Sequence, residues 1–476
     1  MVFSSTIFLF LFLPLTLAGY FICRGIVLRN IFLLLASLIF YSWGEAGYVV
    51  VLLVSISVNY FFGLKIAKHE DNKRKIYLFL AVAANLVLLS YYKYANFLTD
   101  NFNTLLEFTG SQTIEYDPVH LPIGISFFTF QAISYVVDIY RRVAPAQKRF
   151  LEVAVYISLF PQLIAGPIVR YGHIATQITN RKVTLNNAAA GIRRFVMGLA
   201  KKMLIANVLG EVADQIFSSP TGEIGIAAAW LGVLCYALQI YFDFSGYSDM
   251  AIGLGRVFGF KFPENFNYPY VSLSIQEFWR RWHISLSTWF RDYLYIPLGG
   301  NRKSAARTYL NLIIVFLLCG LWHGASWTFV IWGLFHGMFL VFERVGLGSL
   351  LALCPRIIRH TYLVFVVLIS WVFFRADTLE QALAYLGVMF GTSSADGLAT
   401  SLSFYMNNKV MLALAAGLIL STPIYHKIKT IRINPFGTAS NNASLVTANA
   451  ASIGFLILSM IAIAGDTYNP FIYFRF

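Results

Sequence analysis

Apolar segments long enough to cross a membrane recur along the whole chain, and they constrain its fold more than any other feature. Only 12% of the residues are charged and 58% are hydrophobic, whereas a soluble domain averages about 25% charged residues. A membrane-spanning helix needs about 20 apolar residues, so the chain has room for roughly 11–13 transmembrane or re-entrant helices. We therefore predict an all-α polytopic membrane protein, built as one integral-membrane domain over residues 1–476.

The charges between the first apolar segments predict how the chain threads the membrane. Loops rich in Lys and Arg stay in the cytoplasm, and such loops follow the first segment, the third segment and Leu121–Tyr140. The segment between Tyr94 and His120 carries four acidic residues and no Lys or Arg. This alternation places the N-terminus outside the cytoplasm. It also accounts for the net charge of +14 without a nucleic-acid ligand.

The first apolar segment, Ile7–Cys23, has the length of a signal peptide. It lacks a basic stretch before it and a small-residue cleavage site after it. We therefore expect it to be a retained span.

Two apolar segments further along, Leu121–Ser126 and Phe160–Pro167, are interrupted by proline and glycine. Proline removes a backbone donor and disfavours helix in the residue before it. Irregular backbone at membrane depth survives only where protein or a water-filled cavity surrounds it. Two interpretations stay open, namely a kinked helix and a re-entrant segment that lines a pocket.

Residues 258–307 are rich in charged, aromatic, Gly and Pro residues, which predicts short amphipathic helices at the membrane interface. Their cations include Arg280, Arg281, Arg291, Arg302, Lys303 and Arg307. These side chains can face anionic lipid headgroups or bind the phosphates of a soluble ligand through the planar fork of arginine, and composition favours neither. Apolar helices resume over Tyr309–Leu321, Thr328–Phe342, Leu363–Phe374, Val410–Leu420 and Ser452–Ala464, and an aromatic tail, 466–476, is expected on the extracytoplasmic side.

Five of the eight histidines lie in basic loops or near segment ends where solvent is expected, which leaves His283, His323 and His336 as candidates. His336 sits in an apolar stretch, where a hydrogen-bonded core histidine is the simplest interpretation. His323 ends an apolar helix beside Trp322, and an ionisable residue at membrane depth is a functional-site hypothesis by default. We interpret His323 as a catalytic base.

The spacing of these histidines disfavours a metal centre, because no HxxxH pair is present, and we predict no bound metal. The four cysteines are scattered with no CxxC, which predicts neither disulfides nor zinc. Cys319 lies four residues before His323, on the same helical face. A Cys/His couple can carry an acyl thioester, although a small cysteine packed in a helix is the commoner case.

The chain lacks the GxSxG elbow, the P-loop and the GxGxxG motif, which argues against hydrolases and nucleotidases. Composition alone ranks a transporter first and an intramembrane enzyme second. The internal repeat that is common in transporters is not seen.

A set of motifs that runs nearly from end to end decides between these classes. They are Met1–Ser5, Lys93–Phe97, Leu121–Phe127, Phe160–Pro167, Tyr241–Gly253, Glu264–Asn267, Glu277–Ser287, Arg291–Arg302, Gly320–Ala325 and Pro470–Phe476. With them the chain resembles the membrane-bound O-acyltransferase family, and within it the branch that O-acetylates alginate. The branch that adds D-alanine to teichoic acid shares the Arg-Trp-His and Trp-His-Gly elements.

The resemblance implies a helical core crossed by a tunnel, with a cytoplasmic acyl donor at one mouth and an extracytoplasmic hydroxyl acceptor at the other. His323 matches the family's catalytic histidine, and His283 matches the second histidine of its Arg-Trp-His element. The physical argument agrees, since a neutral imidazole can take the proton of an alcohol that attacks a thioester. Trp282, Asn301 or His283 is expected to stabilise the oxyanion, and Trp322 to contact substrate.

The acyl donor that the resemblance implies is acetyl-CoA, and Arg280 and Arg291 are expected to hold its phosphates. The branch typically passes the acetyl group to a periplasmic or membrane-tethered partner of the SGNH-hydrolase type, which implies a place among the lipids of a bacterial inner membrane. Alginate is the expected final acceptor. Peptidoglycan, cellulose and teichoic-acid D-alanylation are alternatives within the enzyme class, and a polysaccharide or lipid transporter is the alternative from another class.

Overall fold

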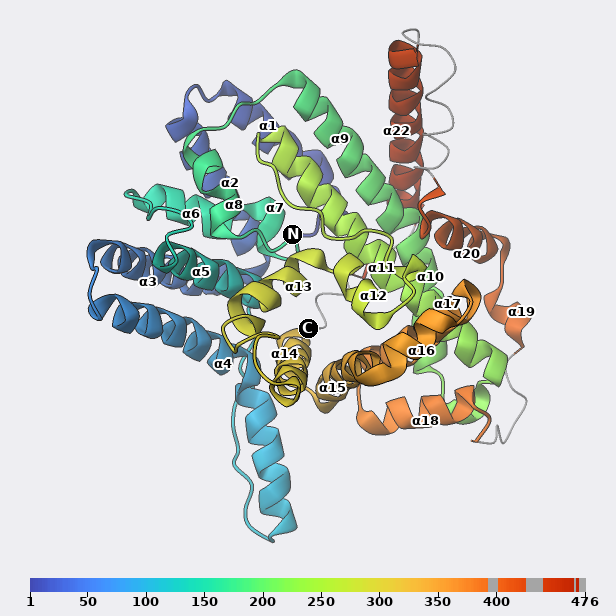
Figure 1. Ribbon diagram of the computed structural model, residues 1–476. Helices are drawn as coiled ribbons and strands as arrows, with labels where there is room; N and C mark the ends of the chain where they lie inside the picture. The colour runs from blue at the N-terminus through green and yellow to red at the C-terminus, as the bar shows by residue number, and fades with distance from the viewer. Residues whose placement is uncertain (393–400, 425–439, 466–467, 471–476) are drawn as a thin grey trace. The chain divides into compact units, whose positions relative to one another are not determined.

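The structure is a computed structural model that describes residues 1–392, 401–424, 440–465 and 468–470 (Figure 1). Within these ranges the regular elements are helices, and no strand occurs, which confirms the all-α prediction. Contacts divide the chain into two compact units. The first comprises Met1–Ile192 and Ala251–Pro263, and the second comprises Arg193–Met250 and the described residues from Glu264 onward. The single domain stays a prediction.

Seven helical segments in the described residues are long and apolar enough to cross a membrane. They are Ile26–Lys68, Lys73–Phe108, Ile226–Val257, Ala305–His323, Trp327–Leu353, Arg356–Arg375 and Val446–Gly465. Three shorter apolar helices are Phe8–Ile22, Ile125–Tyr140 and Asn408–Leu420. A multi-pass membrane protein is therefore confirmed. The total of about 11–13 transmembrane or re-entrant helices stays a prediction.

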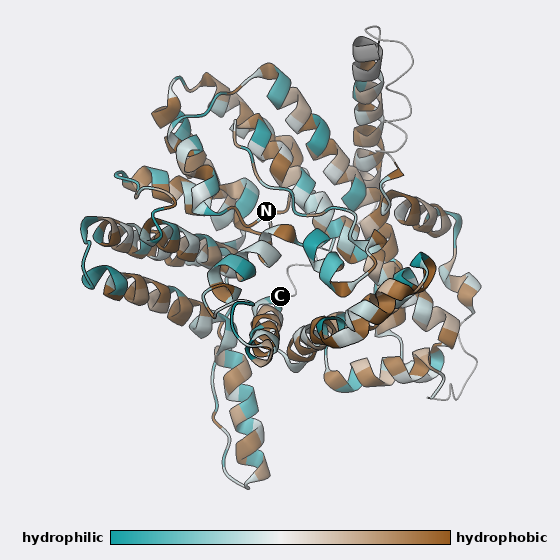
Figure 2. Ribbon diagram, viewed as in Figure 1, coloured by the Kyte–Doolittle hydropathy of each residue, from teal (hydrophilic) through white to brown (hydrophobic). Residues whose placement is uncertain are grey.

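The first unit begins with a π-helical turn, η1 (Phe8–Phe12), that leads into a run of helices. These are α1 (Leu13–Ile22), α2 (Ile26–Glu45), the short η2 (Ala46–Tyr48), α3 (Val49–Lys68), α4 (Lys73–Phe108), α5 (Ile125–Tyr140), α6 (Phe150–Ser158), α7 (Phe160–Leu163) and α8 (Tyr171–Thr179). Inside the unit, Asn59 of α3 and Asn85 of α4 exchange two side-chain hydrogen bonds of 3.0 and 2.8 Å. This pairing satisfies both buried amides where water cannot. Figure 2 shows the hydrophilic turn between α3 and α4.

The two proline-containing segments contact each other inside the first unit. Helix α6 ends at Ser158 and the four-residue α7 follows after Leu159, so the chain is broken here rather than smoothly kinked. Gly124 precedes α5 with φ of 78°, and a Cβ there would lie 2.8 Å from the carbonyl oxygen of Leu163. Only glycine accepts both this backbone and this approach without strain.

Two helices continue from one unit into the other, α9 (Leu185–Ala200) and α11 (Ile226–Val257). The second unit then holds η3 (Lys201–Ala206), α10 (Asn207–Ser218), η4 (Thr221–Glu223), η5 (Pro269–Val271), α12 (Ile275–Arg281), α13 (Ile284–Phe290), η6 (Arg291–Tyr295), α14 (Ala305–His323), α15 (Trp327–Phe342), η7 (Glu343–Leu347), α16 (Gly348–Leu353), α17 (Arg356–Arg375), α18 (Leu379–Met389), α19 (Leu402–Tyr405), α20 (Asn408–Leu420) and α22 (Ser440–Gly465). The predicted apolar helices from residue 309 onward lie within α14, α15, α17, α20 and α22. The short helices predicted within 258–307 are η5, α12, α13 and η6.

The predicted aromatic tail, 466–476, lies outside the described residues except for 468–470. In that short stretch, the buried ammonium of Lys202 donates to the carbonyl oxygen of Pro470, and the amide of Asn207 donates to the carbonyl oxygen of Tyr468 at 3.2 Å. Lys202 also forms a buried ion pair with Asp243 at 2.8 Å. The extracytoplasmic position of the tail stays a prediction.

Candidate functional site

The crossing of α14 and α15 positions His323. A Cβ on Gly320 would lie 2.3 Å from the carbonyl oxygen of Phe329, and a Cβ on Gly333 would lie 2.3 Å from the carbonyl oxygen of Phe316. The two backbones can approach this closely only because both residues lack a side chain. Helix α14 ends at His323, at the point where the chain turns back into α15.

Aromatic rings surround His323, whose exposed fraction is 3%. Its ring centroid lies 4.9 Å from that of Trp322, 5.0 Å from that of Trp332 and 5.2 Å from that of Phe374, and all three pairs are edge-to-face. The next residue, Gly324, is required here, because a Cβ on it would lie 2.1 Å from the ring of Phe329. The Trp-His-Gly sequence therefore holds the imidazole inside an aromatic cage.

His283 lies at the sharp junction between α12 and α13, with a left-handed backbone (φ 41°) that is uncommon for a residue with a side chain. Ser274 caps the start of α12 by accepting the backbone N–H of Glu277. The imidazole of His283 is fully buried, and its Nδ1 lies 3.1 Å from Oδ1 of Asn265. Burial lowers the pKa of His283 from 6.5 to about 3, so the ring is neutral near physiological pH.

The structure brings the two predicted catalytic histidines together around one indole. The ring centroid of Trp322 lies 6.1 Å from that of His283 and 4.9 Å from that of His323. Trp282, the third residue of the Arg-Arg-Trp sequence before His283, packs instead against Trp371, with centroids 5.0 Å apart. Of the two tryptophans predicted to belong to the site, Trp322 contacts the rings of both histidines.

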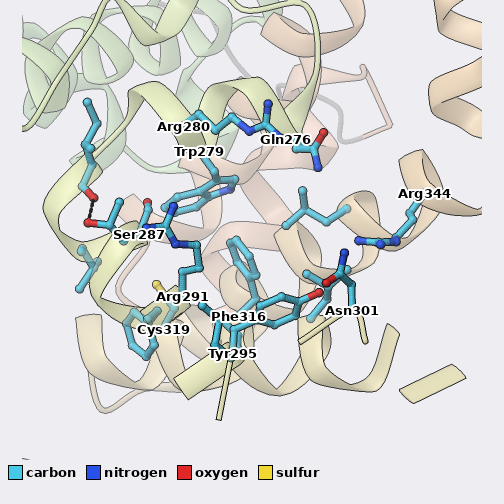
Figure 3. A pocket seen from close by; sticks show the side chains of 18 residues that line it. Gln276, Trp279, Arg280, Ser287, Arg291, Tyr295, Asn301, Phe316, Cys319 and Arg344 are labelled. Carbon is cyan, nitrogen blue, oxygen red and sulfur yellow. Dashed lines mark hydrogen bonds between the residues drawn. The ribbon is translucent and has the colours of Figure 1, made fainter. Parts of the chain in front are cut away.

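A cavity of about 570 Å³ lies between α12, α13, η6, α14 and α15 (Figure 3). Its wall includes Arg280, Arg291 and Asn301, three of the residues predicted to bind substrate. Gln276, Ile284, Leu286, Cys319 and Arg344 are also part of the wall. The predicted histidines and tryptophans are not among the lining residues.

The cavity wall carries three arginines beside several neutral polar side chains. Arg280, Arg291 and Arg344 are all exposed, and Figure 3 shows Arg344 on the same side of the cavity as Asn301. Arg291 pairs with Asp292 at 2.7 Å, whereas within the described residues no carboxylate pairs with Arg280 or Arg344. The sequence analysis missed Arg344. Its signal was an arginine two residues after the apolar helix that ends at Phe342.

The cavity reaches the neighbourhood of both histidines. Ile284, the residue after His283, lines it. Cys319 also lines it and lies one helical turn before His323 on α14. Bound at this cavity, a ligand would therefore contact the elements that carry the two imidazoles.

Trp279 also lines the cavity, and its side chain contacts the buried His336. The indole Nε1 of Trp279 donates to Nδ1 of His336 at 3.3 Å, and His336 is fully buried. This contact is the one expected of a hydrogen-bonded core histidine. Trp332 lies between the rings of His336 and His323, at centroid distances of 5.1 and 5.0 Å.

Comparison with known proteins identifies the family. The family model for membrane-bound O-acyltransferases matches residues 141–379, which include both histidines and every residue of the cavity. The chain is 41% identical to the probable alginate O-acetylase AlgI of Pseudomonas putida over the full length of both proteins. The chain belongs to the membrane-bound O-acyltransferase family.

Other relatives of this O-acyltransferase differ in the acceptor that their names state. The peptidoglycan O-acetyltransferase of Helicobacter pylori is 36% identical over 100% of this chain and 98% of its own length. The teichoic acid D-alanyltransferase of Streptococcus thermophilus is 30% identical, but over only 47% of this chain and 57% of its own. The enzyme class is therefore secure. The acceptor is a matter for proposal.

Proposed function

We propose that this membrane O-acyltransferase moves an acetyl group from cytoplasmic acetyl-CoA to a hydroxyl acceptor on the other side of the membrane. The observation that carries the proposal is the contact of two buried imidazoles with the indole of Trp322, next to a cavity with three arginines. The full-length similarity to alginate O-acetylases supports acetyl as the group and alginate as the final acceptor.

His323 acts as the base in this proposal. An alcohol is a weak nucleophile near neutral pH until its proton is removed, and a neutral imidazole is suited to accept that proton. His323 takes the hydroxyl proton as the oxygen attacks the thioester carbonyl. It then returns the proton to the thiolate of the departing coenzyme A. General-base catalysis contributes about 10²–10⁴-fold, so positioning by the surrounding cage supplies much of the remainder.

The cavity is the proposed donor site. A volume of about 570 Å³ falls within the range usual for small-molecule sites. Arg280, Arg291 and Arg344 supply the planar forks of donors that bind phosphate. Asn301 is placed to donate from the same wall, and Trp282 and Trp322 stay proposals as substrate contacts.

The proposed orientation puts the N-terminus and the acidic segment between Tyr94 and His120 outside the cytoplasm of a bacterial inner membrane. Helix α4 supports it, because its 36 residues exceed the roughly 20 needed to cross a bilayer. Its first turn is basic and its last turns are acidic. A periplasmic or membrane-tethered partner of the SGNH-hydrolase type would receive the acetyl group on that outer side.

Acetyl transfer in sealed vesicles tests the proposal. Purified protein is given radiolabelled acetyl-CoA outside inverted vesicles and a hydroxyl acceptor inside. The His323→Ala variant should remain folded and lose transfer, whereas His69→Ala, in the basic turn between α3 and α4, should retain it. Substantial transfer by His323→Ala would remove the base role.

One further acceptor has specific support. The peptidoglycan O-acetyltransferase relative matches this chain over its full length. Mass spectrometry of alginate and of muropeptides from cells with and without His323→Ala separates the two acceptors. A transporter, the alternative from another class, would instead show altered polymer export with unchanged acetylation.

A further inference from the structure

We propose that Asn265 is a positioning residue that locks His283 in the tautomer with its proton on Nδ1, so that Nε2 meets the acceptor hydroxyl only as a hydrogen-bond acceptor. This inference rests on the proposed function, because it assigns a role to the second histidine of that site. It excludes the oxyanion-donor role that the sequence suggested for His283.

A backbone N–H group, which can only donate, shows which side-chain atom of Asn265 is the amide oxygen. The backbone N–H of Ser285 points at Oδ1 of Asn265 at 3.2 Å, and the hydroxyl of Ser285 donates to the same atom at 2.8 Å. A backbone N–H can only donate, so this atom must be the amide oxygen. On its other side, Nδ2 of Asn265 donates to Oγ of Ser248 at 3.0 Å.

The tautomer of His283 follows from that orientation. Nδ1 of His283 lies 3.1 Å from the same amide oxygen, which has no proton to give. Nδ1 must therefore carry the proton and donate it, which leaves a lone pair on Nε2. Within the part of the chain that the structure describes, Nε2 has no hydrogen-bond partner although it is buried.

The backbone fixes the direction of the ring as well. His283 has φ of 41°, and the flanking chain is tied down by two backbone hydrogen bonds. Ile284 N–H donates to the carbonyl oxygen of Asn265, and Asn267 N–H donates to that of Arg281, both at 2.9 Å. Asn265 therefore holds His283 through its backbone and its side chain together.

The surroundings keep the imidazole neutral. Phe244 lies edge-on at 4.6 Å, Phe266 at 6.4 Å and Trp322 at 6.1 Å between ring centroids. Several charged side chains of the adjoining elements pair with one another, whereas Arg280 of α12 lines the cavity and Lys201 shares Asp249 with Arg194. The pairs are Arg281 with Glu277, and Arg194 with Asp249 and Glu264. A neutral ring with a lone pair at Nε2 can accept a hydrogen bond from the entering hydroxyl and so orient the alcohol. The same O–H then turns to His323, which removes its one proton as the oxygen attacks.

Replacing Asn265 with Asp tests the assignment. The carboxylate keeps an acceptor for Nδ1–H and for Ser285, and the hydroxyl of Ser248 can turn to donate, so the fold is retained. The added negative charge raises the pKa of His283 and protonates Nε2. We expect kcat/KM of Asn265→Asp to fall about tenfold or more at low pH and to recover as pH rises. The limb should lie at higher pH than any limb that protonation of the base His323 gives the wild type.

The matched control is Asn267→Asp, which adds the same charge two residues further on at an exposed side chain. Its pH profile should equal that of the wild type. An Asn265→Asp profile with the same shape as that of the wild type would overturn the proposal, whether the activity is retained or lowered equally at every pH. Retained activity would mean that a protonated Nε2 serves the reaction, and uniform loss in folded protein would mean a structural role alone.

Nitrogen NMR of histidine-labelled protein gives a readout that does not depend on acetyl transfer. The signals of His283 are assigned by their loss in His283→Gln. They should report a protonated Nδ1 and a bare Nε2 in the wild type, and protons on both nitrogens in Asn265→Asp. The opposite tautomer in the wild type would overturn the proposal. If the tautomer is as stated but no acetyl is transferred, the proposed function fails instead.

Discussion

The imidazole of His283 lies against the indole of Trp322, with ring centroids 6.1 Å apart and planes at 62°. Trp322 is itself the neighbour of His323 and contacts that ring at 4.9 Å. One side chain thus spaces the two imidazoles of the candidate site. The two histidines come from different motifs, and their shared contact with Trp322 brings them into one site.

Removing this spacer should impair turnover more than binding. We expect Trp322→Ala to lower kcat by about tenfold or more with a smaller change in donor KM, because misplacing reacting groups reduces catalysis steeply. Trp322→Phe should recover part of the loss. Steady-state kinetics measure both, and Trp43→Ala, at a tryptophan that is 56% exposed on α2, serves as the control. An unaltered kcat in Trp322→Ala would contradict the spacing role.

Reversing the charge of the cavity arginines should weaken donor binding. We expect Arg280→Glu, Arg291→Glu and Arg344→Glu each to raise the donor KM by roughly tenfold, since each removes a fork of phosphate donors and adds repulsion. Arg302→Glu makes the same change at an exposed arginine outside the cavity wall and should have little effect. Equal donor KM values in all four variants would place the donor elsewhere.

The close crossing of α14 and α15 should not tolerate an added methyl group. Gly320→Ala and Gly333→Ala force the helices apart, and overpacking of this kind destabilises by about 1–3 kcal/mol. Thermal unfolding in detergent measures the change. Gly454→Ala, on α22 where no atom lies within 4 Å of the new Cβ, should be neutral or stabilising. Unfolding temperatures that match across the three variants would disprove the packing argument.

The buried His283 should make the fold sensitive to acid. Its pKa is about 3 in the folded protein against 6.5 as the ordinary value. Between these limits the unfolded chain binds a proton that the folded chain does not, so stability falls as pH falls, by about 1.4 kcal/mol per unit from this group. Unfolding measured between pH 5 and about 7 should show a shallower slope for His283→Gln. His69→Gln should keep the wild-type slope.

Much of the fold could be predicted from local sequence, because a span in lipid must satisfy its own backbone. The apolar segments Tyr309–Leu321 and Leu363–Phe374 lie inside helices α14 and α17. Cavity residues that lie close together in the sequence could also be predicted. Arg280, Arg291 and Asn301 line the cavity because α12, η6 and the loop after it fold around the same space.

Features that depend on distant segments could not be predicted. No local pattern shows that Asn265 accepts from both His283 and Ser285. These hydrogen bonds form only when the loop that carries Asn265 meets the start of α13. Likewise, the sequence left open whether the segment at Phe160 is a kinked helix or a re-entrant segment that lines a pocket. The contact of Gly124 with Leu163 fills the space beside that segment, and it is a tertiary effect.

One carboxylate of the second unit contacts the last described residues of the chain, and this contact has a practical consequence. Asp214 of α10 accepts the hydroxyl of Tyr468 at 2.5 Å and the guanidinium of Arg375 at 2.6 Å. A shortened protein that stops after α22 would leave that carboxylate with only one of these donors and deprive Lys202 of the Pro470 carbonyl. Engineers who attach a fluorescent or affinity module should therefore keep Tyr468 and Pro470 in place.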